Sequence, residues 1–465
     1  MSPSSERGTP HYQADFPPEE LSARRRRVAA EIGDGAVAVL RGAPATGAFD
    51  LFRQTNELYY LSGVEVPHAY LLLRGGSGEA TLYLPPHDAR HERSEGAVLN
   101  AGYAEEAAAL TGIERVRPLS ALGEDLAGCR ALYVPHSPAE TRQACRDTLR
   151  FRDHLAEADP WEAKPDADGR FRQLLRQQCP DAELRDLSPI LDRHRLLKSE
   201  RELALMRRAG ELTAWAVVEA MRGTRAGLRE FHLAAAADYL YLLHGARGGG
   251  YRPIVASGAN IWNAHYYRNG DELREGELVL IDYAPDYGYY TSDIGRMWPV
   301  SGRYSPVQRE LYGFVVRYHQ SLLRLLRPGV TPEQVLQEAA AEMAPVIAPT
   351  GFSKPEYRRA AERMLEFPGH LSHPVGMAVH DVGSYFGRPM EPGLVFALDP
   401  QMWVPEEELY VRVEDTVAVT ATGVEVLTRA APLELDEVER VMREPGLLDH
   451  YPPNWPVSAG SSHSA

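Results

Sequence analysis

Cysteine is scarce in this sequence: Cys129, Cys145 and Cys179 are the only three among 465 residues. An odd number of widely spaced cysteines indicates neither a disulfide framework nor a zinc knuckle. The sequence also lacks a run of about eighteen apolar residues and an apolar segment at its N-terminus. We therefore expect a soluble protein of the reducing cytoplasm, without a membrane partner.

Positive charge is also in short supply. The formal net charge is -15, and no basic block offsets it, which argues against nucleic acid as a partner. A short basic cluster, Arg24 to Arg27, lies in a segment with helical periodicity, Leu21 to Ile32. The pattern predicts a solvated helix face there rather than a nucleic-acid contact.

The length and the order of patterns predict two domains, because 465 residues exceed what a single core usually holds. Residues 16–186 alternate helical stretches with apolar strand-like runs at 35–40, 69–73, 80–84 and 130–134, which is typical of an α/β domain. Residues 187–444 form the second domain, and 1–15 and 445–465 read as poorly ordered extensions. In the second domain we expect helices at 198–210, 212–221, 228–243, 305–326 and 331–343.

Acidic and imidazole side chains are concentrated between residues 265 and 414. Asp282 ends the apolar run Leu278–Ile281, and Asp293 follows eleven residues later, which predicts two adjacent strands that each deliver one acid. Glu414 closes another strand-like run, in which alternation places Arg412 on the same face. With Asp399 there are four carboxylates, and their convergence would be repulsive unless cations lie between them.

Oxygen ligands with an imidazole suit hard or borderline divalent ions, of which we expect manganese, with zinc, cobalt or iron as alternatives. Four carboxylates carry more charge than one ion needs, so two ions with bridging carboxylates are the expected stoichiometry. Two ions about 3.5 Å apart can hold a hydroxide between them and polarise a carbonyl. This chemistry is hydrolysis of an amide or ester in a peptide or small amide substrate.

The ligand motifs resemble those of the "pita-bread" metallopeptidases of family M24, in the aminopeptidase P and Xaa-Pro dipeptidase (prolidase) branch. The matching segments are Asp282, Asp293-Ile-Gly-Arg296, His373-Pro-Val-Gly-Met-Ala-Val-His-Asp381, Leu398-Asp-Pro400 and Arg412-Val-Glu-Asp415. Upstream, Phe52–Gly63 resembles a recurring segment of the aminopeptidase P N-terminal domain. The resemblance covers roughly residues 16–430 and implies a creatinase-like α/β N-terminal domain followed by an α+β pita-bread catalytic domain.

The resemblance also implies a role for each site residue. Asp293 and Glu414 would bridge two metal ions, Asp282 would chelate one, and His373 with Asp399 would serve the other. Glu414 would also act as the general base. His265 and His380 match histidines that contact the substrate and handle the leaving proline, and Arg412 would be a substrate-side or supporting cation. Relatives assemble as dimers or tetramers, so we expect a homodimer or homotetramer.

Several positions depart from the family pattern, among them Tyr283-Ala284, which replaces a usual Ala-Gly after the first ligand. Asp399 and Gln401 stand in a segment that is usually Glu-Pro-Gly, and Gly295 replaces a usual threonine. The first histidine of a His-Gly-x-x-His segment is displaced by one position, to His370. The leading hypothesis is an Xaa-Pro aminopeptidase that attacks with a metal-bridging hydroxide; the alternatives are an Xaa-Pro dipeptidase, a metal-free creatinase-like hydrolase and a non-catalytic scaffold.

Overall fold

The structure is a computed structural model that describes residues 12–47, 50–162 and 166–450. The chain divides into two compact units, Met1–Arg195 and Leu196–Ala465. This division follows helix α8 (Ser188–Leu196), whereas the sequence predicted it before that helix. The reason is that α8 bonds to the first unit: Arg195 donates to the buried Glu140 at 2.8 Å, and Tyr60 donates to the carbonyl oxygen of His194 at 3.0 Å.

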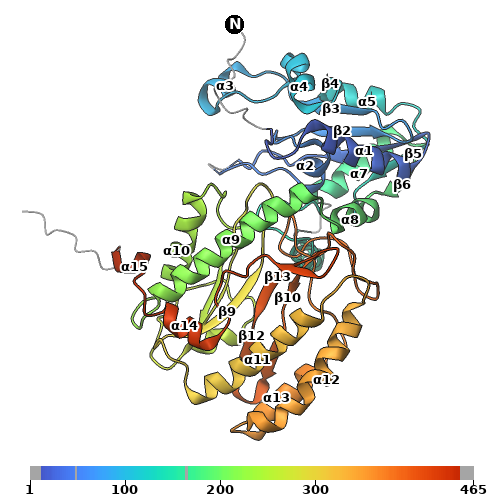
Figure 1. Cartoon of the computed structure of the whole chain (residues 1–465). Helices are drawn as coiled ribbons and strands as arrows, with labels where there is room; N and C mark the ends of the chain where they lie inside the picture. Colours follow the sequence, from blue (N-terminus) through green and yellow to red (C-terminus); the bar gives the residue numbers. More distant parts are fainter. Residues whose placement is uncertain (1–11, 48–49, 163–165, 451–465) are drawn as a thin grey trace, which may run out of the picture. The chain divides into compact units, whose positions relative to one another are not determined.

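The first unit is built on a six-stranded mixed sheet in the order β4-β3-β2-β1-β5-β6 (Figure 1). Its strands are β1 (Ala36–Arg41), β2 (Tyr70–Arg74), β3 (Ala80–Leu84), β4 (Arg115–Pro118), β5 (Ala131–Val134) and β6 (Glu183–Asp186). Its helices, besides α8, are α1 (Pro18–Ile32), α2 (Asn56–Ser62), α3 (Ala89–Glu95), α4 (Ala104–Thr111), α5 (Leu122–Asp125), α6 (Arg146–Ala158) and α7 (Ala167–Gln178). The four predicted strands are confirmed as β1, β2, β3 and β5.

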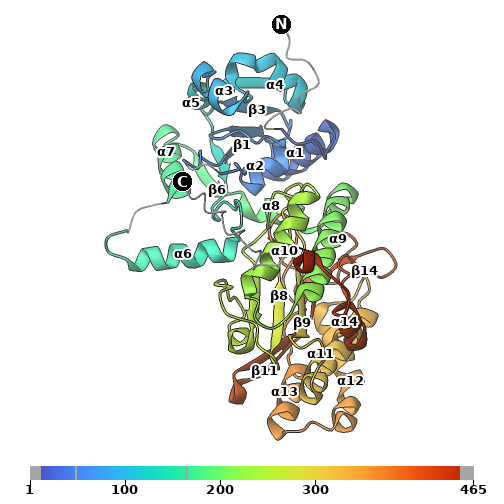
Figure 2. The ribbon, with the colours of Figure 1, turned by 90° about the vertical axis from the view of Figure 1, so that its left-hand side faces the viewer.

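The second unit is built on an antiparallel sheet in the order β10-β13-β9-β8-β7, with β14 paired to β13. These strands are β7 (Ile254–Ser257), β8 (Leu278–Asp282), β9 (Ile294–Pro299), β10 (Val395–Leu398), β13 (Glu414–Val419) and β14 (Val424–Val426). A separate hairpin consists of β11 (Gln401–Val404) and β12 (Leu409–Arg412). Figure 2 shows β8 and β9 side by side, as their pairing requires.

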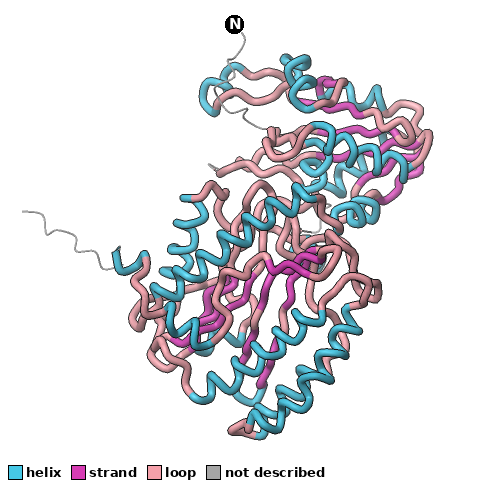
Figure 3. Tube along the Cα trace, in the orientation of Figure 1, coloured by secondary structure: helices cyan, strands magenta, loops and turns pink. Residues whose placement is uncertain are grey.

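Helices surround the sheet of the second unit, as the colours of Figure 3 show. They are α9 (Glu200–Gly223), α10 (Glu230–Leu243), α11 (Pro306–Leu325), α12 (Pro332–Thr350), α13 (Pro355–Leu365), α14 (Leu435–Val441) and α15 (Leu447–His450). Helix α9 packs on α10 and α11 packs on α12, and both pairs contribute to one apolar core with the sheet. Among the described residues, none of the helices is both long and apolar enough to cross a bilayer.

The expected extensions carry structure wherever they are described. The Gln13 side chain donates to the carbonyl oxygen of Phe16 at 2.8 Å, and Tyr12 pairs with Val64. At the other end, Leu448 of α15 is buried and Asp449 accepts from Arg225 at 2.7 Å. Residues 1–11 and 451–465 of the same prediction lie outside the described residues.

The prediction of a solvated face for the arginine cluster was wrong for half of it. Arg24 and Arg25 are buried, while Arg26 and Arg27 are exposed. Arg24 stacks on the Phe16 and Tyr60 rings, each 4.3 Å from its guanidinium carbon. Its guanidinium donates to the carbonyl oxygen of Tyr60 at 3.2 Å, so these charges are internal hydrogen-bond donors of the first unit.

Candidate metal centre

Three predicted carboxylates meet at adjacent strand ends of the second sheet. Asp282 ends β8, Asp293 directly precedes β9, and Glu414 begins β13, where it lies opposite Gly295 of β9. All three side chains are at least nine-tenths buried. Buried carboxylates without compensation are costly, so their convergence favours a site that could hold cations.

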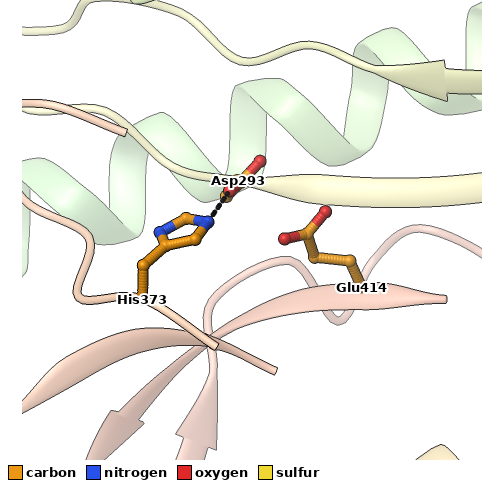
Figure 4. Close-up of side chains that lie close together, drawn as sticks. All are labelled: Asp293, His373 and Glu414. Carbon is orange, nitrogen blue, oxygen red and sulfur yellow. Dashed lines mark ion pairs between the residues drawn. The ribbon is translucent and has the colours of Figure 1, made fainter. Parts of the chain in front are cut away.

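His373 completes a set of donor atoms with two of these acids (Figure 4). One ligand atom each from Asp293, His373 and Glu414 lies within 4.8 Å of the other two. His373 is held beside β10, because its carbonyl oxygen accepts from the Ala397 amide at 2.9 Å. Oxygen and imidazole donors at this spacing fit a borderline divalent cation.

The protonation of His373 suits a ligand. Burial and the neighbouring His380 lower its pKa to about 3, so the ring is neutral at physiological pH. Nδ1 lies 3.2 Å from the carbonyl oxygen of Pro374, and Nε2 lies 3.4 Å from Asp293 Oδ2. A neutral ring that donates from Nδ1 presents Nε2 as the lone-pair donor toward the acids.

Arg412 lies among the carboxylates rather than facing outward. Its Nη2 donates to Asp282 Oδ2 at 2.9 Å and contacts Glu414 Oε2, and its Nε lies 3.5 Å from Asp399 Oδ1. Although burial alone would lower it, the surrounding Asp399, Tyr410 and Asp282 raise the pKa of Arg412 well above its usual range. One guanidinium offsets one of four negative charges, so the pocket still has room for cationic charge.

Gly295 provides the space for that guanidinium. A Cβ at this position would lie 2.7 Å from Arg412 Nε and 3.0 Å from Glu414 Cβ. The usual threonine of the family pattern would therefore collide with Arg412 as it is placed here. The departure at Gly295 and the inward position of Arg412 are two parts of one arrangement.

Asp399 stands next to the donor set but is held by other groups. Its Oδ2 accepts from the Gln401 amide, and burial raises its pKa above the usual range. Asp282 and Asp399 thus contact Arg412 and Gln401, while Asp293, His373 and Glu414 converge. The predicted five ligands occupy one pocket, but only three are arranged as a ligand set.

Tyr251 is a buried member of the site that the sequence analysis did not single out. Its hydroxyl lies 2.7 Å from Asp282 Oδ1 and 3.0 Å from Asp293 Oδ1. Burial and these two acids raise its pKa well above 10, so it is a permanent donor. The preceding Gly250 permits a close neighbour, because a Cβ there would lie 2.4 Å from Thr291 Oγ1.

Burial and the nearby Asp282 also raise the pKa of Asp293 well above its usual range. Hydrogen bonds to Asp293 come from two neutral donors, the Tyr251 hydroxyl and, at 3.0 Å, the Ile294 amide, so a place for a counter-charge remains beside it. A proton or a divalent cation can fill that place. The structure thereby favours cation binding at Asp293, on the chemistry of the donor set.

The two substrate histidines of the prediction form a row with His373. The ring centroids of His373 and His380 are 4.1 Å apart, and those of His380 and His265 are 6.0 Å apart. His373 belongs to the donor set, and the rings of His380 and His265 follow it in this order. The structure therefore brings His265, His380 and Arg412 into the same site as the predicted metal ligands.

The chain was compared with known protein families and structures. Residues 204–421 match the pattern of Metallopeptidase family M24, and residues 21–133 match the aminopeptidase P N-terminal domain. The Xaa-Pro aminopeptidase of Escherichia coli is 32% identical over 91% of this chain and 97% of its own length.

Solved structures agree with these matches. Zn-substituted aminopeptidase P from E. coli in complex with product has a TM-score of 0.74 and 30% identity. Proline aminopeptidase P II from Yersinia pestis has the same TM-score and identity. Each alignment covers 92% of this chain and 99% of the solved chain.

Proposed function

Because the chain belongs to metallopeptidase family M24, we propose that it is an Xaa-Pro aminopeptidase, which removes an N-terminal residue that precedes proline. The observation that carries the proposal is the convergence of Asp293, His373 and Glu414 in a buried, acid-rich pocket. The similar proteins support a peptide substrate, because the E. coli relative, which aligns over nearly its full length, is an Xaa-Pro aminopeptidase.

Two divalent cations would be held by Asp282, Asp293, His373, Asp399 and Glu414, with Asp293 and Glu414 shared between them. When bound, they would polarise the scissile carbonyl and lower the pKa of the attacking water. We propose manganese as the cation of the cell, with zinc, cobalt or iron as alternatives. Zinc stays among these alternatives because a solved structure of the E. coli relative is Zn-substituted.

The residues of this chain would perform the proton transfers. Glu414 accepts a proton from the water that attacks the carbonyl carbon, which requires hydrogen-bond reach of that water. The row of His380 and His265 stabilises negative charge on the carbonyl oxygen and guides a proton to the proline nitrogen as the C–N bond breaks. Arg412 holds Asp282 and Glu414 in place between turnovers.

The first test replaces a shared ligand without changing its size. Asp293→Asn and Glu414→Gln should each lower kcat for a Xaa-Pro-Xaa peptide by about 10³-fold or more, because each removes a ligand and Glu414 also serves as base. Metal content by elemental analysis should fall below two ions per chain. Glu425→Gln is the matched control. Glu425 lies on β14, is half-buried and accepts a hydrogen bond from Arg207. Full activity in both variants would refute the proposal.

The same elemental analysis decides against the metal-free alternatives. A creatinase-like hydrolase or a non-catalytic scaffold would leave purified protein without stoichiometric metal, whereas the proposal requires about two ions per chain. Full hydrolysis after exhaustive chelation would establish a metal-free enzyme.

Peptide length separates the aminopeptidase from the Xaa-Pro dipeptidase. An aminopeptidase should cleave a longer Xaa-Pro-Xaa peptide at least as well as Gly-Pro, whereas a dipeptidase should cleave Gly-Pro alone. The homodimer or homotetramer and the cytoplasmic location stay predictions, which analytical ultracentrifugation and cell fractionation would test.

A further inference from the structure

A cavity of about 380 Å³ lies in the second unit, between hairpin strand β11 and helices α11 to α13. Its wall is mainly apolar, with Leu322, Leu336, Ala360, Met364, Phe367 and Trp403 among the lining residues. This volume lies in the range of about 300–1,000 Å³ that is typical of small-molecule sites. We call it the side pocket.

The side pocket adjoins the metal centre at Asp399, which lines the cavity and lies 3.5 Å from Arg412 Nε. Asp399, Pro400 and Gln401 form one end of its wall, and Ser372, which precedes His373, lies beside them. The pairing of β11 with β12 places Gln401 directly opposite Arg412, which contacts the carboxylates. A side chain of a molecule bound at the metal centre would enter this cavity past Asp399 and Gln401.

Three of the departures from the family pattern line this one cavity: Asp399, Gln401 and the displaced His370. His370 stacks on Phe386 with ring centroids 4.9 Å apart and meets the Phe367 ring edge-on at 5.6 Å. A Cβ on Gly369 would lie 2.4 Å from the Phe367 ring, so a larger residue there would displace this ring. Gly369 and His370 thus give the mouth of the side pocket its aromatic lining.

The wall of the side pocket also contains one buried polar group of interest. The Tyr318 hydroxyl, on the wall of the cavity, has no hydrogen-bond partner among the described residues, and burial raises its pKa to about 12. It is therefore neutral and able to donate. A buried hydroxyl without a partner is costly, and a ligand with a polar tip would supply the missing hydrogen bond.

The histidine row indicates which part of a substrate enters. His265 and His380 do not line the side pocket, and on the proposed mechanism they serve the leaving proline. The residue on the other side of the scissile bond is the one released from the N-terminus. We propose that the side pocket binds the side chain of this first residue and selects large, uncharged, preferably aromatic side chains, an inference that rests on the proposed function.

The test measures kcat/KM for Gly-Pro-Ala, Leu-Pro-Ala, Phe-Pro-Ala and Tyr-Pro-Ala with the metal-loaded full chain. Burial of a large side chain in an apolar site should favour Phe and Tyr over Gly by about tenfold or more. Ala360→Met, on α13, fills the cavity and should lower the Phe-to-Gly ratio about tenfold. Arg359→Met introduces the same side chain at the preceding, exposed position and should leave that ratio unchanged.

Leu336→Phe fills the cavity from α12 and repeats the test if the Ala360 variant does not fold. A Phe-to-Gly ratio near one in the unsubstituted protein overturns the side-pocket proposal and leaves the aminopeptidase intact. An equal loss for all four peptides in both filling variants also overturns it. Absence of hydrolysis for every Xaa-Pro peptide overturns the proposed function and this inference together, and the two failures are thereby distinguishable.

Discussion

Arg412 is a built-in counter-cation for the acids of the site. Its guanidinium contacts Asp282 and Glu414 and approaches Asp399, so it lowers the repulsion that these buried carboxylates would otherwise feel. A charge fixed to the chain permits the pocket to fold before any metal binds. The pocket stays acidic, because one positive charge does not balance four negative ones.

Substitution of Gly295 should reveal how closely Arg412 is packed. Gly295→Ala should lower the free energy of unfolding of the metal-free protein by about 1–3 kcal/mol, since the new methyl group must push the guanidinium away from the carboxylates. Urea unfolding measures this change. In the control, Gly313→Ala inside α11, the nearest atom is 3.9 Å away, so stability should rise by about 0.5–1 kcal/mol. Equal effects in both variants would contradict the packing argument.

Tyr251 should act on metal affinity without being a ligand. Tyr251→Phe removes the donor shared by Asp282 and Asp293, and loss of such a supporting hydrogen bond usually weakens metal binding about 10–100-fold. Titration calorimetry with Mn measures the change. Tyr304→Phe is the control, because its buried hydroxyl donates to the carbonyl oxygen of Met297 instead. Similar losses in both variants would mean that only general packing was disturbed.

The sequence predicted the acids and histidines of the site but not the contacts that hold them. Asp282, Asp293 and Glu414 are recognisable because each lies next to an apolar strand, a local pattern, although Glu414 begins β13 rather than closing the predicted run 409–414. Tyr251 and Gly295 could not be assigned in the same way. Their importance comes from contacts formed across the fold. Tyr251 contacts Asp282, thirty-one positions away, and Gly295 makes room for Arg412.

At the scale of elements, helix α9 shows how a glycine can mislead. The sequence predicted separate helices at 198–210 and 212–221, whereas α9 runs unbroken from Glu200 to Gly223. Gly210 is inside it because a Cβ there would lie 2.5 Å from the carbonyl oxygen of Leu427. The glycine permits a close approach by a distant segment, which periodicity cannot show. A capping box of Ser199 and Glu202 marks the start of α9.

Some elements were not predicted because their signals are weak. Strands β4 and β6 lie at the two edges of the first sheet and have no fully buried residue, so their sequences lack apolar runs. Helix α12 extends to Thr350 although Pro345 and Pro349 lie within it. Its packing against α11 and α13 stabilises turns that the two prolines alone would disfavour.

Helix α11 carries a histidine that should make stability depend on pH. His319 is completely buried, and burial lowers its pKa to about 4 although Asp415 lies 3.2 Å away. The ring is therefore neutral at pH 7, and this contact is not an ion pair. Below pH 6.5 this histidine is protonated in the unfolded chain but stays neutral in the folded chain. The free energy of unfolding therefore falls as the pH drops from 6.5 to 4, by about 3 kcal/mol from this group.

The contribution of His319 can be isolated by difference. His319→Gln should destabilise the protein at pH 7 through lost packing, and the gap to the unsubstituted protein should narrow by about 3 kcal/mol between pH 7 and pH 4. Urea unfolding at both pH values measures the gap. His91→Gln, at an exposed position of α3, should show no such narrowing. A gap that is constant with pH would refute the assignment.

At the scale of the whole chain, each unit has its own apolar core. In the first unit, Val39, Leu72 and Leu132 of the sheet pack with Leu175 of α7. In the second unit, one cluster joins the sheet with α9 to α14. The two-domain organisation was predictable from length and pattern, because each sheet has local apolar signatures. The exact division was not, since α8 is assigned to its unit by ion pairs such as Arg195 with Glu140.

Metal binding should stabilise the second unit selectively, because all its ligands belong to that unit's sheet and loops. Manganese at about 100 times its Kd should add about 2.7 kcal/mol to the free energy of unfolding of this unit. Hydrogen exchange should therefore slow for amides of β8, β9 and β13, while β1 and β2 keep their rates. Glu414→Gln removes a shared ligand and should abolish the response. Equal protection of both sheets would show that the ion acts on the chain as one cooperative unit.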